Sequence, residues 1–309
     1  MAETDASNAS KGLIYGFLGI VGFSVTLPAT KLAVMAFDPL FVGLSRAVVA
    51  ACMAAPLLYF TRQKIPTHAQ IKSLFIVMLG VIIGFPVLTT WAMQTAPASH
   101  GAVVVGLLPL ATALAGAWRA HERPTPVFWC ASVVGSATVV GYALLNGGGS
   151  FNATDFILLA AVAAAALGYA EGGRLAREIG GWQVICWALV FSVPVIIAPA
   201  AFGAWKTGLE GFTNAPASAW GGFAYAAAVS QFLGFFAWYH GLALGGVARV
   251  GQIQLLQPFM TLGFSALLLG EKIAPLAIVA MGVAALAIFV GRRWGAVVVA
   301  AEPIATDTK

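Results

Sequence analysis

Apolar residues fill the chain in ten long runs, separated by short breaks that carry polar residues, glycine or proline. Crossing the hydrocarbon core of a bilayer, which is roughly 30 Å thick, takes about 20 helical residues. Runs such as ILLAAVAAAALGYA are apolar on every face, whereas strands of a membrane barrel alternate polar and apolar residues. The pattern predicts an all-α membrane protein with ten transmembrane helices at 12–35, 39–60, 70–94, 98–118, 125–145, 154–174, 181–203, 217–243, 248–270 and 273–292.

The fourth and ninth runs repeat each other at a constant offset of 149 positions. Identical residues recur without a gap at Pro109/Pro258, Thr112/Thr261, Ala117/Ala266, Glu122/Glu271 and Pro126/Pro275. Five predicted spans lie between Glu122 and Glu271, and an odd number places these two residues on opposite sides of the bilayer. Inverted repeats of this kind are typical of secondary transporters. We therefore expect two antiparallel five-helix halves, 12–145 and 154–292, with cytoplasmic tails at 1–11 and 293–309.

Composition and charge support this interpretation. Hydrophobic residues make up 60% of the chain and charged residues only 9%, and the mean hydropathy is +0.91, which excludes a water-soluble domain of this length. With the N-terminus inside, twelve basic residues fall on the cytoplasmic side and three, Lys31, Lys206 and Lys272, outside. This bias predicts that both termini are cytoplasmic. The net charge of +5 then reflects topology, and we infer no nucleic-acid partner from it.

Four segments resemble the EamA-type repeat of the drug/metabolite transporter superfamily. They are GFSVTLPATK (22–31), PLFVGLSRAVVAA (39–51), LLPLATALAGAWRAHE (107–122) and LLQPFMTLGFSALLLGE (255–271). Within that superfamily the chain is similar to the YddG-like exporters of aromatic and other neutral amino acids. The resemblance implies one EamA-type repeat in each half, an inner-membrane location in a bacterium, and transport in the exporting direction.

Arg46 lies deep inside a predicted span, seven residues or roughly 10 Å of helix past Pro39. An arginine at that depth needs a partner or a wet cavity. Its guanidinium is suited to hold a substrate carboxylate through paired hydrogen bonds. The alternative is that the side chain snorkels outward or ties its helix to carbonyls of a neighbouring helix.

Three further positions follow from comparing the two copies. His100 aligns with Arg249 at the start of the repeated helix, and its near-neutral pKa permits a protonation switch, although basic residues at such positions are also ordinary at membrane interfaces. Gln254 and Gln257 replace the apolar residues of the first copy and share one helix face. They are candidates to line a polar path or bind an amino acid, and the alternative is that they hydrogen-bond neighbouring helices.

Amide and aromatic residues recur together on two other predicted helices. Gln231 and Trp238 share a face of the eighth, and Gln94 lies beside Trp91 on the third. Such groups suit a neutral, partly aromatic solute, but aromatic residues near helix ends also form the interfacial belt. We expect a substrate site that draws on Arg46, Trp91, Gln94, His100, Gln231, Trp238, Gln254 and Gln257.

The remaining polar and proline positions have structural interpretations. Proline inside a span removes a backbone donor, so Pro28, Pro86, Pro109 and Pro258 are hinge candidates in a rocking transporter. Glu122 and Glu271 each end a repeated helix beside a basic residue. We interpret both as structural groups that fix helix ends against the other repeat.

Absent motifs narrow the function further. No GxxxxGK[ST] sequence occurs, so the chain has no phosphate-binding loop for ATP, and a gradient must drive transport. We expect no cofactor and no metal. An intramembrane enzyme needs a nucleophile with a base or paired acids inside the spans, and a channel would conduct without saturation. The sequence predicts instead a secondary transporter of neutral and aromatic amino acids, threonine and methionine included, or of other small metabolites or drugs. Its partners are the solute and the bilayer, and a monomer is compatible with the sequence.

Overall fold

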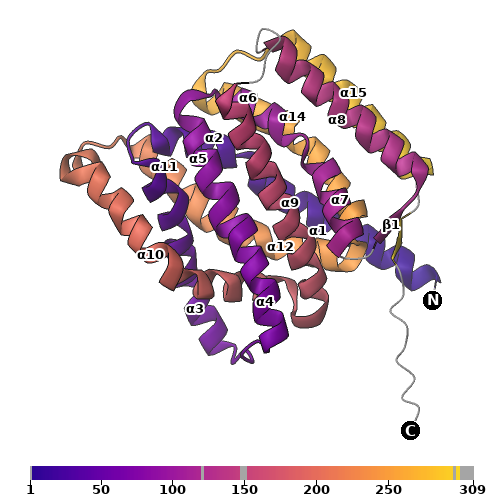
Figure 1. Cartoon of the computed structure of the whole chain (residues 1–309), viewed down its shortest axis with the longest axis horizontal. Coiled ribbons are helices and arrows are strands. Elements are labelled where there is room, and N and C mark those ends of the chain that lie inside the picture. The colour runs from indigo at the N-terminus through magenta and orange to yellow at the C-terminus, as the bar shows by residue number, and fades with distance from the viewer. Residues whose placement is uncertain (1, 120–121, 147–151, 295–296, 300–309) are drawn as a thin grey trace.

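Helices make up almost all of the chain that the structure describes. The computed structural model covers residues 2–119, 122–146, 152–294 and 297–299 (Figure 1). The first half contains α1 (Ala2–Ser24), α2 (Thr26–Val34), the π-helical η1 (Phe41–Ser45), α3 (Arg46–Phe60), α4 (His68–Val77), the π-helical η2 (Met78–Gly84), α5 (Phe85–Thr95), α6 (Ala98–Val105), α7 (Leu108–Arg119), the strand β1 (Glu122–Pro124) and α8 (Pro126–Asn146).

The second half runs from α9 (Ala153–Ile179) to the strand β2 (Val297–Val299). Between them it contains α10 (Gly181–Thr213), α11 (Ala217–Tyr225), the π-helical η3 (Ala226–Leu233), α12 (Gly234–Gly245), α13 (Val247–Gly251), the 3₁₀ segment η4 (Gln252–Leu256), α14 (Gln257–Leu269) and α15 (Pro275–Trp294). Helix α9 lies in the middle of the molecule and packs against α4, α5, α7, α10 and α12 (Figure 1).

The predicted helical membrane protein is confirmed, apart from one pair of three-residue strands. Within the described residues, seven stretches are long and apolar enough to cross a membrane: Asn8–Val34, Phe41–Phe60, His68–Thr95, Ala98–Arg119, Ala153–Ile179, Gly181–Thr213 and Val247–Leu269. Shorter apolar helices occupy Pro126–Thr138 and Pro275–Ala287. They belong to α8 and α15, which lie side by side along one edge (Figure 1). The chain is therefore a multi-pass membrane protein.

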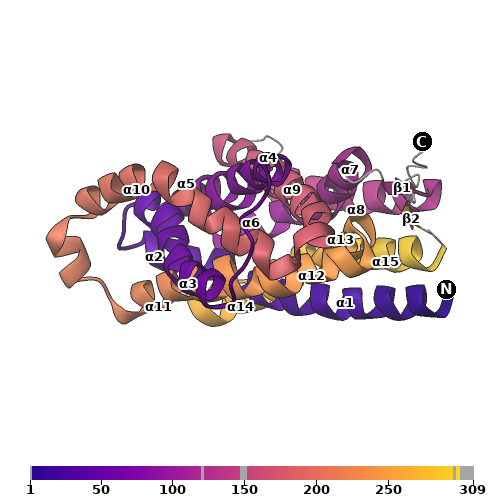
Figure 2. The same ribbon diagram turned by 90° about the horizontal axis from the view of Figure 1, so that it is seen from below.

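The helices at both ends of the chain extend beyond the predicted spans. Helix α1 begins at Ala2 instead of position 12, because no glycine or proline interrupts the polar stretch before Gly12. It runs as one straight rod along a face of the molecule (Figure 2). At the other end α15 continues to Trp294 and β2 follows at Val297–Val299. Positions 1, 295–296 and 300–309 of the predicted tails lie outside the described residues.

The two strands pair across the halves. β1 and β2 form an antiparallel ribbon in which Glu122 is opposite Val299 and Pro124 is opposite Val297. The ribbon joins the end of the first repeated helix to the segment after α15. No sequence pattern predicted it, because three residues are too few to show an alternation.

Helix interruptions recur at equivalent places in the halves. Between α6 and α7 the helix breaks at Gly106 and Leu107, and 149 positions later the same helix of the second half passes through η4. Pro109 and Pro258 each follow within two residues. Because proline has no N–H and clashes with the preceding turn, regular α-helix stops one turn earlier. The first span breaks at Val25, three residues before Pro28, for the same reason.

Glycines bring two helices of different halves into backbone contact. On α1 and α12, Gly16 faces Gly241 and Gly12 faces Gly245. A Cβ on Gly241 would lie 2.6 Å from the backbone nitrogen of Gly16, and one on Gly12 would lie 2.7 Å from that of Gly245. Only glycine permits this approach, which is the usual means of tight helix packing in membranes.

Candidate functional site

Arg46 is a buried cation. It opens α3 directly after the π-helical turn η1, and its side chain is 2% exposed. Its Nε and Nη1 atoms have no hydrogen-bond partner in the described structure. The side chain therefore does not snorkel to an interface. A buried guanidinium with free donors is costly unless a ligand or water satisfies them.

A small cavity lies beside Arg46, between the two halves. Its volume is about 20 Å³, room for roughly one water molecule. Its lining comes from both halves: Phe23, Thr26, Leu27, Arg46, Val81, Phe85, Tyr169, Ser230, Phe235 and Gln257. The hydroxyls of Thr26 and Ser230 lie 2.7 Å apart and join the halves at its wall. No carboxylate is among these described lining residues.

Two of the predicted site residues, Arg46 and Gln257, meet in this cavity. Gln257 opens α14 next to Pro258 and is 5% exposed. The sequence did not single out Tyr169, Thr26 or Ser230. Tyrosine and hydroxyl residues are unremarkable inside apolar helices, so only the folded arrangement identifies them.

Aromatic rings form one side of the cavity and the layer behind it. The ring centres of Phe23 and Phe235 are 4.9 Å apart, and those of Tyr169 and Trp238 are 5.3 Å apart. Trp238 is fully buried behind the lining, and its Nε1 has no partner in the described structure. Tyr239 is also fully buried and donates to the carbonyl of Gly168 at 3.1 Å. The interfacial-belt alternative therefore does not apply to Trp238.

Gln254 and Gln231 hydrogen-bond between the halves instead of lining the cavity. The amide of Gln254 donates to the Thr112 hydroxyl at 3.4 Å, and that of Gln231 donates to the Val81 carbonyl at 3.2 Å. Both side chains are 1% exposed. For Gln254 this is the position of the interhelical-bond alternative, although its Oε1 has no partner in the described structure.

Trp91 and Gln94 are not brought to the cavity. Both lie on the exposed face of α5, and Trp91 is 47% exposed. Their spacing placed them on one side of a helix but could not show which side faces the protein. A ring on this face is positioned for lipid or the interface.

His100 contacts Asp155, an acid that the sequence pattern did not mark as its partner. Its Nε2 lies 2.6 Å from Oδ1 of Asp155, which is 1% exposed. The other oxygen of Asp155 accepts from the backbone N–H of Asn152, and the Asn152 side chain accepts from the N–H of Asp155. This reciprocal pair caps α9. The sequence signal for this helix cap is an acid three residues after an asparagine, at the start of an apolar run.

Glu122 and Glu271 each accept hydrogen bonds at the start of a repeated helix in the other half. Glu122, from the first half, bonds the start of α13, and Glu271, from the second half, bonds the start of α6. The two oxygens of Glu122 accept from the N–H groups of Val247 and Ala248, both at 2.6 Å, where α13 begins. Those of Glu271 accept from Ala98 at 2.9 Å and Ser99 at 2.8 Å, where α6 begins. Carboxylates at helix starts satisfy free donors and favour the helix dipole. These contacts are of the kind that the predicted structural role requires.

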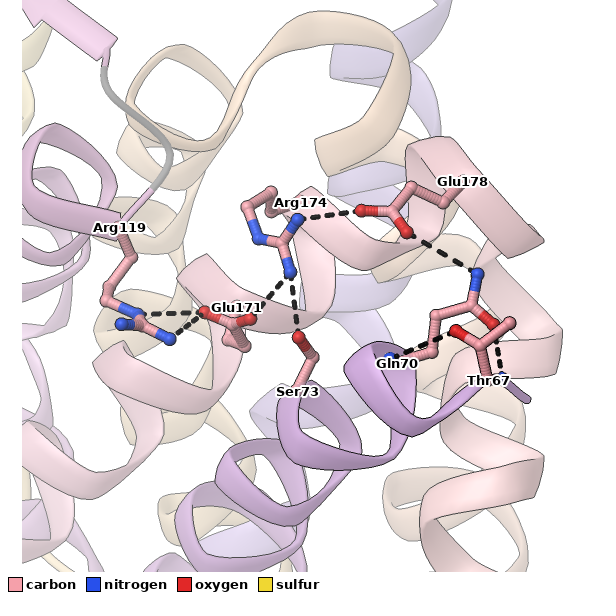
Figure 3. A network of polar contacts seen from close by, with 7 residues as sticks. All are labelled: Thr67, Gln70, Ser73, Arg119, Glu171, Arg174 and Glu178. Atoms are coloured by element: carbon pink, nitrogen blue, oxygen red, sulfur yellow. Dashed lines mark hydrogen bonds and ion pairs between the residues drawn. The ribbon is translucent and has the colours of Figure 1, made fainter.

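A chain of ion pairs and hydrogen bonds centres on α9 (Figure 3). Glu171 of α9 is 1% exposed and lies between Arg119 of α7, at 2.8 Å, and Arg174, at 2.9 Å. Arg174 continues to Ser73 of α4 and to Glu178, and Arg177 reaches Glu122 at 3.2 Å. The sequence indicates part of this network, because Glu171 and Glu178 are three and four residues from Arg174 on the same helix.

Comparison with known families decides what kind of protein this is. The profile of the EamA-like transporter family matches the chain twice, over residues 10–144 and 152–291. The chain belongs to the EamA-like transporter family. The resemblance found in the sequence is thereby confirmed, and both matched regions contribute to the wall of the cavity.

Two relatives and one solved structure are similar over most of this EamA-like chain. "Uncharacterized transporter YdeK" of Bacillus subtilis is 46% identical over 90% of this chain and 95% of its own. A "Probable terminal-alkyne amino-acid exporter" of Streptantibioticus cattleyicolor is 24% identical over 90% of this chain and 93% of its own. A crystal structure 18% identical in sequence matches with a TM-score of 0.64 over 91% of this chain and 96% of its own, which shows a shared fold.

Proposed function

We propose that this protein is a secondary transporter that exports neutral and aromatic amino acids by alternating access between two inverted five-helix halves. Ten crossings result when α8, α15 and the segment 217–245 are added to the seven long apolar stretches. Glutamine, tyrosine and histidine lower the mean hydropathy of segment 217–245, which still has the length to span. We place the protein in a bacterial inner membrane with both termini cytoplasmic, as the distribution of basic residues predicts.

The observation that carries this proposal is the buried, unpartnered guanidinium of Arg46 facing a cavity built by both halves. Transporters of inverted repeats bind their solutes at the interface of the repeats, near interrupted helices. The break at Gly106 and the segment η4 provide such interruptions. The probable amino-acid exporter among the relatives supports the substrate class.

The cavity in this conformation is too small for an amino acid, so the halves must separate at one end for a solute to enter. Pro28, Pro86, Pro109 and Pro258 each follow a break or a π-helical turn by three residues or fewer. Backbone that is already interrupted bends at low cost. We assign the hinges of the motion to these four places.

Counterflow in liposomes tests the function directly. Vesicles that contain the purified protein are preloaded with unlabelled threonine, methionine or phenylalanine, and entry of the labelled form is followed. Saturable, chemically unchanged exchange is the expected result. Arg46→Ala and Gln257→Ala should each slow the exchange about tenfold or more, because hydrogen bonds to charged groups contribute roughly 1.5–3 kcal/mol. Arg249→Ala is the matched control, since Arg249 is exposed.

The alternatives predict different results in the same vesicles. Flux that does not saturate would favour a channel, and a converted product would favour an enzyme. Absence of exchange for all three amino acids would contradict the proposed substrate class.

For energy coupling we propose uniport or coupling through His100, whose ring contacts Asp155. Uniport predicts no accumulation under an imposed pH gradient. Coupling through the histidine predicts accumulation that His100→Gln abolishes. Accumulation that persists in His100→Gln would contradict both.

A further inference from the structure

The charges around the cavity do not balance. Arg46 brings one positive charge, and the described lining contains no Asp or Glu. Glu171 lies two residues from Tyr169 on α9, but Arg119 and Arg174 already hold it in ion pairs. No acid is therefore left at this site for Arg46, or for a positive charge on a solute.

The hydrogen-bonding groups of the wall show the same asymmetry. Arg46 offers two donors without partners, at Nε and Nη1. The hydroxyls of Thr26 and Ser230 bond to each other at 2.7 Å. The rest of the wall is aromatic or aliphatic, apart from Gln257 and the phenol of Tyr169. The group that matches the free donors of Arg46 is an anion with several acceptor lone pairs.

From these observations we propose that the site selects its solutes by a free carboxylate on an apolar body, and that it does not require an α-amino group. This inference rests on the proposed function and names the class of substrate for the same site. A carboxylate matches a guanidinium in charge and can accept two parallel hydrogen bonds. Once the halves separate, the rings of Phe23, Tyr169 and Phe235 would face an aromatic or branched apolar body.

The amino group of a zwitterion is a cost at this site. An ammonium brought near Arg46 in surroundings of low dielectric is repelled by it, and no described carboxylate compensates. Aromatic faces attract ammonium groups, but the same rings lie beside the guanidinium. Apolar carboxylates without the amino group should therefore bind at least as well as the corresponding amino acids.

Competition for phenylalanine counterflow tests this selection with three analogues. 3-Phenylpropionate lacks the amino group, phenylalaninamide lacks the carboxylate, and phenethylamine lacks the whole carboxyl group. We expect 3-phenylpropionate to inhibit at concentrations no higher than phenylalanine, and the other two to need about tenfold more. Equal inhibition by phenylalaninamide and phenylalanine would overturn the proposal, as would weak inhibition by 3-phenylpropionate.

Substitutions at Arg46 test whether this residue causes the preference for a carboxylate. In Arg46→Gln the preference for 3-phenylpropionate over phenylalaninamide should disappear, and Arg46→Lys should keep part of it. Arg249→Gln, an exposed cation, should leave the preference unchanged. A preference that survives in Arg46→Gln would contradict the assignment.

A binding measurement on the unaltered protein covers the case in which a variant does not fold. In detergent, 3-phenylpropionate should raise the midpoint of thermal unfolding and phenylalaninamide should not, because a ligand stabilises the state that binds it. This measurement also separates the two proposals. Carboxylate-dependent stabilisation without amino-acid exchange would contradict the proposed function alone, and exchange without carboxylate selectivity would contradict this inference alone.

Discussion

The starts of the two repeated helices are closed by equivalent glutamates, but in different surroundings. Glu122 is 2% exposed and also accepts from Arg177, which lies on α9 together with Glu171 and its ion pairs. Glu271 is half-buried and makes its bonds with two backbone N–H groups, and no ion pair to it is found in the described part of the chain. The repeated glutamate therefore makes the same hydrogen bonds to a helix start in both halves, but only Glu122 has an additional ion pair among the described residues. We expect the contact between Glu271 and the start of α6 to open at a lower free-energy cost than the contact between Glu122 and the start of α13.

Removing Glu122 should have the largest effect. Glu122→Ala leaves the buried N–H groups of Val247 and Ala248 without an acceptor and removes the partner of Arg177, which is 31% exposed. A buried N–H group without an acceptor costs about 1–3 kcal/mol, so the midpoint of unfolding in detergent should fall sharply. Glu122→Gln, which keeps the size and an acceptor, should lose less. A smaller effect than that of Glu271→Ala would contradict the comparison.

Glu171→Gln should come next. The change removes the charge that holds Arg119 and Arg174 but retains an oxygen for one of them. We expect a loss of about 3 kcal/mol, measured by the same unfolding experiment. Unchanged stability would show that the two arginines find water at this end of the molecule.

Glu271→Ala should cost less than either. Its two backbone bonds at the start of α6 are those of a helix cap in a half-buried place, worth about 1–2 kcal/mol. Glu271→Gln is the control, because an amide oxygen still accepts one of the bonds. A loss as large as that of Glu122→Ala would remove the difference between the ends.

Glu178→Ala should have the smallest effect of the four. The pair with Arg174 spans one turn of α9, and its carboxylate is 43% exposed. Such helix pairs contribute about 0.3–0.5 kcal/mol, and added salt should screen this contribution. Unfolding midpoints at low and high ionic strength measure it, and a salt-independent loss would place Glu178 within the buried part of the network.

The helices were predictable because burial in lipid leaves a local signature, an apolar run about 20 residues long. The candidate site was predictable only in part. Arg46 and Gln257 stand out as polar groups inside such runs, whereas Tyr169 and Ser230 do not. Which helix face looks inward depends on contacts between distant segments, so the spacing of Trp91 and Gln94 could not place them. The partners of Glu122 and Glu271 are more than 120 positions away in the sequence.

The β1–β2 ribbon has a consequence for biosynthesis. Glu122 and Val299, which face each other in it, are 177 positions apart in the chain (299 − 122). At about 5–20 residues per second, translation separates them by roughly 9–35 s. During that interval the first half sits in the membrane before its strand partner and the α13 donors for Glu122 have been made. The end of the molecule with the most ion pairs is thus among the last to assemble on a nascent chain.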